Sequence, residues 1–127
     1  MALSVGETAR WPVELRLKRA EKLLEIAFDD GSQFSLPAEY LRVESPSAEV
    51  QGHGPGQKTL VPGRAHVGII GIEPVGNYAV RITFDDLHDT GIYSWSYLHQ
   101  LGVERERRWR DYLDALAANG LNREPAR

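Results

Sequence analysis

The stretch LEIAFDD, residues 24–30, decides the fold because a close copy of it, VRITFDD, returns at residues 80–86. In both copies apolar residues alternate with polar ones, which is the pattern of a β-strand with one buried face. Each strand ends at two aspartates, a residue type that turns favour. Each copy is followed by a glycine, an aromatic residue and a Tyr-Leu pair: Gly31, Phe34 and Tyr40-Leu41, then Gly91, Tyr93 and Tyr97-Leu98. Each copy therefore predicts a strand, an Asp-rich turn, a short strand and a helical turn, with two unrelated units that share common turn residues as the alternative.

The sequence around these two copies extends the same period of two. We expect strands at residues 13–17, 24–28, 33–36, 66–73 and 78–84. The first two pair as a hairpin, and the last two are joined by a turn at residues 74–77. Pro37 is suited to the first turn of a short helix. Two similar units of this kind predict a pseudo-duplicated, mostly antiparallel sheet.

Longer helices are expected only near the C-terminal end. Ser94 or Ser96 can cap a short helix that ends at Gly102, and residues 103–118 form one long helix. Its buried stripe at helical spacing consists of Trp109, Tyr112, Leu113 and Leu116. Its arginines alternate with acids, which favours a solvated helix face over contact with RNA or an acidic partner. The fold class is therefore α+β, a mainly antiparallel β-sheet module with an internal strand-turn-strand echo and a C-terminal helix.

Length and composition restrict the class of protein. With 127 residues the chain is one domain, expected over residues 11–118 between a flexible N-terminus at 1–10 and a flexible tail at 119–127. A net charge of −3 argues against a dedicated nucleic-acid binder. No apolar run is long enough to span a membrane and the first residues do not have the pattern of a signal peptide, so we expect a cytoplasmic protein. The complete lack of cysteine excludes disulfides, Cys-ligated metals and a cysteine nucleophile.

The segment from Glu44 to Gly63, ESPSAEVQGHGPGQKTLVPG, is a long loop without periodicity. Loops of this length are usually functional or disordered, and we expect this one to be ordered and functional. Its candidate binding residues are Ser45, Ser47, Glu49, Gln51, His53, Gly54 and Lys58. Further candidates, Asp86, His88 and Tyr93, lie in the turn and strand after the second copy. Because the echo places the loops of both units at one end of the sheet, we expect these two segments to meet.

Catalytic and metal motifs are weak in this sequence. The string GHGPGQKT at residues 52–59 approaches a phosphate-binding loop, but Gln57 replaces a required glycine and Pro62 follows where a helix should begin. Anion binding by its backbone amides stays open. No serine lies in a GxSxG motif, so no catalytic residue is assigned. His53, Asp86 and His88 can supply the two-His, one-carboxylate set of a non-haem iron site, which is kept as an alternative.

A family resemblance follows from longer strings of residues. The chain carries Asp30-Gly31, Phe34, Leu36-Pro37 and Tyr40-Leu41-Arg42, and further on Gly91-Ile92-Tyr93-Ser94-Trp95 and Tyr97-Leu98. This pattern, over about Trp11 to Gly102, resembles the gamma-butyrobetaine hydroxylase N-terminal-like domain. The strings SPSAEVQGHGPGQ (45–57) and IEPVGNYAV (72–80) are especially similar to its free-standing bacterial branch.

The resemblance implies a small β-rich α+β module. In the hydroxylases this module precedes an oxygenase domain that holds iron and 2-oxoglutarate, and nothing in this sequence corresponds to that second domain. A similar module occurs in a plastid P-loop protein that helps to assemble iron–sulfur clusters. The resemblance thus implies a role without catalysis, in iron or iron–sulfur metabolism.

The hydroxylase module binds zinc through a Cys-x-Cys-x-x-Cys segment and a later histidine. Carried onto this chain, the cysteine positions fall at Ser45, Ser47 and Val50, and the histidine falls near Gly91 or Ile92. Valine cannot ligate zinc and neutral serines are poor ligands. We therefore expect no zinc at these positions and no cofactor, with iron at His53, Asp86 and His88 as the alternative.

Together these observations predict a non-catalytic, cytoplasmic binding or accessory module. The expected partner is a protein or a small ligand, not a nucleic acid or a membrane. A homodimer formed through the C-terminal helix is a further alternative.

Overall fold

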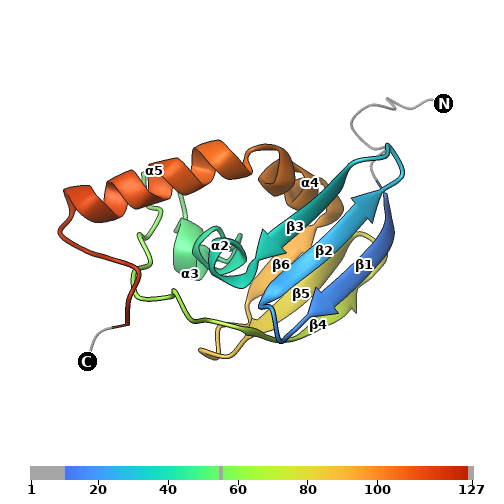
Figure 1. The fold of residues 1–127 in the computed structure, drawn as a ribbon, viewed down its shortest axis with the longest axis horizontal. Coiled ribbons are helices and arrows are strands. Elements are labelled where there is room, and N and C mark those ends of the chain that lie inside the picture. The colour runs from blue at the N-terminus through green and yellow to red at the C-terminus, as the bar shows by residue number, and fades with distance from the viewer. Residues whose placement is uncertain (1–10, 55, 126–127) are drawn as a thin grey trace.

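The computed structural model describes residues 11–54 and 56–125, which form two three-stranded antiparallel sheets (Figure 1). The first sheet consists of β1 (Pro12–Lys18), β2 (Leu23–Phe28) and β3 (Gln33–Pro37), in that order. The second consists of β4 (Ile69–Val75), β5 (Ala79–Phe84) and β6 (Gly91–Ser94), again in that order. The α+β class and the antiparallel pairing are confirmed, but the two units form separate sheets and not one continuous sheet. The expected flexibility of residues 1–10 and 126–127 lies outside the described residues.

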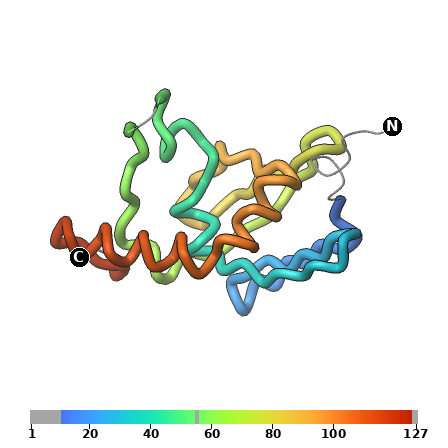
Figure 2. Tube along the Cα trace, turned by 90° about the horizontal axis from the view of Figure 1, so that it is seen from above, coloured from blue at the N-terminus to red at the C-terminus, as the bar shows by residue number. Residues whose placement is uncertain are grey.

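Each sheet is followed by a helix, α2 (Ala38–Val43) after the first and α4 (Trp95–Val103) after the second. A one-turn helix, α3 (Ala48–Gln51), interrupts the long loop, and α5 (Arg105–Ala118) is the long C-terminal helix. Figure 2 shows the segment between α2 and β4 arching away from the sheets and returning beside α5. None of the helices in the described part of the chain has the length and apolarity needed to cross a membrane.

The main core lies between the two sheets and is built from the repeated strands. Leu24, Ile26 and Phe28 of β2 are buried, as are Val80, Ile82 and Phe84 at the matching positions of β5. The alternation that predicted these strands therefore selects the core residues correctly. A smaller apolar cluster lies beneath α5, and its members are Val43, Val50, Val61, Tyr112 and Leu116.

The turns after β2 and β5 have the same hydrogen bonds, which confirms the echo. The amide of Phe28 donates to the carbonyl of Ser32 at 2.9 Å, and that of Phe84 donates to the carbonyl of His88 at 3.0 Å. In both turns the second aspartate accepts a hydrogen bond from the backbone amide two residues further on. Asp30 accepts from Ser32 at 2.9 Å and Asp86 accepts from His88 at 3.1 Å. The two units thus repeat local structure as well as sequence.

The two units also exchange equivalent contacts. The hydroxyl of Tyr40 in α2 donates to the carbonyl of Leu101 in α4 at 2.6 Å. The hydroxyl of Tyr97 in α4 donates to the carbonyl of Glu44, just after α2, also at 2.6 Å. Each tyrosine therefore satisfies a carbonyl near the C-terminal end of the helix that belongs to the other unit.

A second exchanged pair joins each helix to the turn of the other unit. Arg42 of α2 donates from Nε to Asp86 at 2.8 Å, and His99 of α4 lies 3.0 Å through Nε2 from Asp30. The aspartates that end the two repeated strands are thus held by the opposite helix. Their turns are positioned by tertiary contacts as well as by local ones.

Several expectations from the sequence need correction. The hairpin turn occupies residues 76–78, so that Pro74 lies in strand β4, an edge strand where its missing N–H is tolerated. The strand expected at residues 66–73 begins only at Ile69. Leu113 is 38% exposed and not part of the buried stripe, while Tyr112 and Leu116 face the core as predicted.

Gly102 does not end the short helix, which continues to Val103. Glycine is needed here because the ring of Phe34 lies directly against its Cα, and a Cβ at this position would overlap that ring. The glycine thus allows α4 to pack directly on β3.

The described part of the expected flexible tail makes specific contacts. The amides of Gly63 and Ala65 donate to the carbonyls of Asn122 and Arg123, at 3.1 and 2.9 Å. The guanidinium of Arg123 binds both carboxylate oxygens of Glu39 and lies over the ring of Trp109. Residues 121–125 therefore pack against the body of the domain.

Gly102→Ala is expected to destabilise the protein, although alanine normally stabilises a helix interior by about 0.5–1 kcal/mol. Forcing a methyl group against Phe34 should instead cost about 1–3 kcal/mol. Urea unfolding monitored by circular dichroism measures the change. In a Phe34→Ala background the same substitution should lose most of its cost, and an equal cost in both backgrounds would contradict the close-packing explanation.

Candidate functional site

The long loop and the turn after β5 meet, as the sequence predicted. Ser45 Oγ lies 2.9 Å from Nε2 of His88, and Glu49 Oε1 lies 3.1 Å from Nδ1 of the same ring. A third contact of 2.7 Å joins the hydroxyls of Ser47 and Thr90. Three side chains of the loop segment therefore hold the turn through two of its residues.

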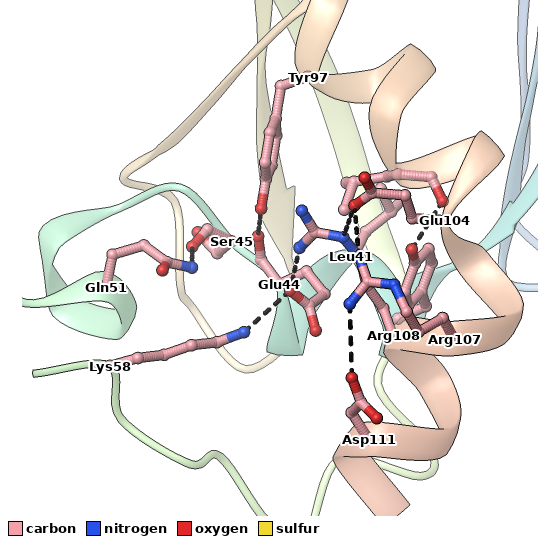
Figure 3. A network of polar contacts seen from close by, with 12 residues as sticks. Leu41, Glu44, Ser45, Gln51, Lys58, Tyr97, Glu104, Arg107, Arg108 and Asp111 are labelled. Atoms are coloured by element: carbon pink, nitrogen blue, oxygen red, sulfur yellow. Dashed lines mark hydrogen bonds and ion pairs between the residues drawn. The ribbon is translucent and has the colours of Figure 1, made fainter. Parts of the chain in front are cut away.

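Local hydrogen bonds explain why the loop is ordered here. The hydroxyl of Ser47 caps α3 by accepting from the amide of Glu49 at 3.1 Å. Gly52 ends α3 with a φ of +74°, and a Cβ there would strike the backbone oxygen of Gln57 at 2.6 Å. Gln51 donates through Nε2 to the carbonyl of Ser45 at 2.9 Å, as Figure 3 shows. These contacts fold the first half of the loop onto itself.

The contacts of Ser45, His88 and Glu49 follow the order of a hydrolase triad: hydroxyl, imidazole, carboxylate. Their burial is the reverse of what catalysis needs. Ser45 is 0% exposed, whereas the side chain of Glu49 is 64% exposed. There is also no room beside the hydroxyl, because a Cβ on Gly91 would lie 2.5 Å from Ser45 Oγ. No substrate can reach this serine, so the relay acts as a structural connection.

Two arginines bind the carboxylate of Asp86 in this turn. Arg42 and Arg64 donate through Nε to the same carboxylate oxygen, Oδ2, at 2.8 and 2.7 Å. Burial alone would raise the pKa of Asp86, but the backbone N–H of His88 and the two guanidinium groups outweigh burial and hold this pKa below its ordinary value. Asp86 is therefore an anion with a structural role.

His88 is buried between these groups. Burial lowers the pKa of its imidazole below the ordinary value, and the nearby cation of Arg42 lowers it further, although Glu49 and Asp86 act in the opposite direction. The neutral ring can donate from one nitrogen and accept at the other. This matches its position between a hydroxyl and a carboxylate.

The other predicted candidates lie in different surroundings. Tyr93 is in the core, where its hydroxyl donates to the carbonyl of Leu41 at 2.5 Å. His53 is exposed, and its amide bonds to the side chain of Gln57. Gly54 is half-buried next to it. Tyr93 is therefore not part of a surface to which a ligand can bind.

The structure offers no metal site in the regions it describes. Within residues 11–54 and 56–125, no three His, Asp or Glu side chains are grouped so that they could hold a metal ion. The positions that correspond to the zinc-binding cysteines, Ser45, Ser47 and Val50, are all buried. Two of them make hydrogen bonds and the third packs in the smaller apolar cluster. Iron binding by His53, Asp86 and His88 stays a prediction from the sequence.

Lys58 belongs to a second region, between the loop and α5 (Figure 3). It donates to Oε1 of Glu44 at 2.9 Å, and Arg108 of α5 donates to the same oxygen at 2.8 Å. Glu44 is buried, and Arg108 is mostly buried against the ring of Tyr97. Arg108 is thus not part of a solvated helix face, which corrects the interpretation of that arginine cluster. Beside this cluster runs a groove of about 470 Å³, lined by Leu60, Val61, Arg107, Asp111 and Ala115, among others.

Sequence reasoning missed several residues that build these two regions: Arg42, Glu44, Arg64, Leu87, Thr90 and Arg108. The echo carried a usable signal for two of them. Arg42 takes the position of His99, after the Tyr-Leu pair, and Leu87 takes the position of Gly31 after the two aspartates. Glu44 takes the position of Leu101, four residues after the tyrosine, but the repeat gives no sign of its carboxylate's role, nor of the roles of Arg64, Thr90 and Arg108.

Comparison with known proteins gives consistent results. The profile of the family described as gamma-butyrobetaine hydroxylase-like, N-terminal, matches residues 15–99. One solution NMR structure is 44% identical over 94% of this chain and 94% of its own, with a TM-score of 0.82. Another is 46% identical over 100% of this chain and 93% of its own, with a TM-score of 0.80.

A crystal structure from Acidithiobacillus ferrooxidans ATCC 23270 is also similar. It shows a protein of unknown function in the DUF971 family, 37% identical over 72% of this chain and 91% of its own, with a TM-score of 0.61. No curated protein matches the chain.

The lowered pKa of His88 predicts a pH dependence of stability. Between the folded-state and unfolded-state pKa of this residue, the unfolded chain binds the proton and the folded protein does not. The free energy of unfolding should therefore fall as the pH drops below about 6.5. Urea titrations between pH 7.5 and pH 5 measure the slope. His88→Gln should flatten it, and a slope that survives in His88→Gln would contradict the assignment.

Glu44→Gln should destabilise the protein by about 1.5–3 kcal/mol, because Arg108 loses a charged acceptor in a mostly buried position. Glu104→Gln is the matched control, since Glu104 also accepts from Arg108, at 2.7 Å, but is more exposed. The control should lose less stability than Glu44→Gln in thermal or urea unfolding. Equal losses of stability in the two variants would show that the burial of Glu44 does not strengthen its contribution.

Proposed function

The chain belongs to the family of gamma-butyrobetaine hydroxylase-like N-terminal domains, and we propose that it acts as a non-catalytic binding module for a protein partner in the cytoplasm. Its binding surface, called the loop face below, consists of residues 47–54 and of the turn at residues 85–90. A solved member of the DUF971 family is likewise described as a protein of unknown function, so the proposal rests on the arrangement of this site.

The observation that carries the proposal is that some side chains of this region hold the loop in place, while others from the same segment are exposed. Ser45, which lies just before the loop face, and Ser47 and His88 within it direct their polar atoms inward, where they fasten the loop to the turn. Glu49 and His53 present exposed side chains from the same segment. A surface that is ordered before its partner arrives loses less conformational entropy on binding than a disordered one.

The buried relay also favours binding over catalysis. Its hydroxyl has no access to solvent, so this serine, although it is part of an arrangement with the order of a catalytic triad, cannot attack a substrate. A small ligand and a second copy of the chain are alternative occupants of the loop face. No observation favours the iron-dependent role that the resemblance implied.

Chemical-shift mapping tests this proposal. The ¹⁵N-labelled protein is titrated separately with the macromolecular and the small-molecule fractions of an extract from its source cells. We expect the macromolecular fraction to perturb the amides of residues 47–54 and 85–90, while those of strand β1 stay unchanged.

The variant Glu49→Lys should weaken this perturbation, and Glu14→Lys in strand β1 is the control. Perturbation by the small-molecule fraction alone, by added unlabelled protein, or in strand β1 would contradict the proposal.

A further inference from the structure

Leu87, at the apex of the turn after β5, occupies an unfavourable position in two respects. Its φ is +74°, in the left-handed region that side chains other than Gly, Asn and Asp rarely adopt. It is also 79% exposed, the highest value among the large apolar residues that the structure describes. Leucine here carries a cost in backbone conformation and a cost in hydration.

The first unit shows that the turn itself does not require leucine. Gly31 takes the equivalent position with a φ of +89°, and its amide donates to the carbonyl of Phe28 at 3.0 Å. The amide of Leu87 makes the matching bond to Phe84, also at 3.0 Å. Glycine is the residue expected at such a position, so the leucine serves something other than the turn.

Packing does not account for the leucine either. Leu87 belongs to neither of the apolar clusters found in the described residues. Its neighbours in the chain are nevertheless firmly held, Asp86 by Arg42 and Arg64 and His88 by Ser45 and Glu49. The result is an apolar side chain on a rigid support, so that its burial by a partner costs little conformational entropy of the backbone.

The charges around the leucine indicate the kind of partner. Asp85 and Asp89 flank it in the turn, and both are exposed. Neither forms a salt bridge within the described part of the chain, although Asp89 interacts electrostatically with Arg81. The exposed carboxylate of Glu49 belongs to the same surface through its contact with His88. Acidic surroundings disfavour anionic membranes and nucleic acids and match basic groups on a protein.

We propose that Leu87 is the anchor of a docking surface for a protein partner that presents an apolar pocket rimmed by basic side chains. This inference rests on the proposed function, because it names the residue and the partner chemistry of the loop face. The partner's pocket takes the leucine side chain, and its basic rim meets Asp85, Asp89 and Glu49.

Site-specific photo-crosslinking in the source cells tests the inference. The probe, p-benzoylphenylalanine, is placed at position 87 and, as controls, at Val13 and Val103, which are 66% and 65% exposed. We expect a discrete adduct from position 87 that neither control gives. Combining the probe with Asp85→Lys and Asp89→Lys should reduce this adduct at least about tenfold, whereas Asp111→Lys and Asp114→Lys should not.

Four outcomes of this experiment would overturn the inference. They are no adduct from position 87, the same adducts from the control positions, an adduct that is insensitive to the charge reversal, and an adduct with the mass of two copies of this chain.

Leu87→Gly separates a docking role from a structural one. Because glycine relieves the backbone and removes an exposed apolar group, the melting temperature should stay the same or rise. Shift perturbation of the loop face by the macromolecular fraction should be lost. A clear drop in melting temperature would show that the leucine is structural, and unchanged perturbation would reject Leu87 as the anchor while leaving the proposed binding function intact.

Discussion

The exchange of tyrosine hydrogen bonds between α2 and α4 is the contact on which the rest of the structure depends. The hydroxyls of Tyr40 and Tyr97 reach from each helix to the C-terminal end of the other, and burial raises the pKa of both, that of Tyr97 to about 12. A buried hydroxyl without a partner is costly, and so is a carbonyl left over at a helix end. Each bond removes both costs and joins the two units at the same time.

The proposed binding surface arises from a difference between two otherwise similar turns. Asp30 and Asp86 end equivalent strands, and each is held by the helix of the opposite unit. Only the second turn is also covered by the long loop, whose residues Ser45 and Glu49 bind His88. The contact with the opposite helix holds both turns in place. The contacts with the long loop belong to the second turn and distinguish it from the first.

Sequence pattern predicted the strands well because alternation along LEIAFDD and VRITFDD reports directly which side chains enter the core. It failed where the reason for a residue is non-local. The sequence predicts a helix end at Gly102, because the ring of Phe34 that packs against this glycine is far away in sequence. The sequence predicts Arg108 as a surface charge, whereas the structure pairs it with the buried carboxylate of Glu44. The meeting of loop and turn was predictable from the repeat, whereas the inward direction of Ser45 was not.

The exchanged contacts have the form of an isologous interface, in which each copy offers the other the same pair of residues. This single chain is thus organised like a homodimer whose subunits have been joined end to end. In a true homodimer every substitution appears twice, so a strained leucine in one turn would burden both. Joined in one chain, the units are free to diverge. One turn has Gly31, while the other carries Leu87 and His88 and belongs to the proposed binding surface.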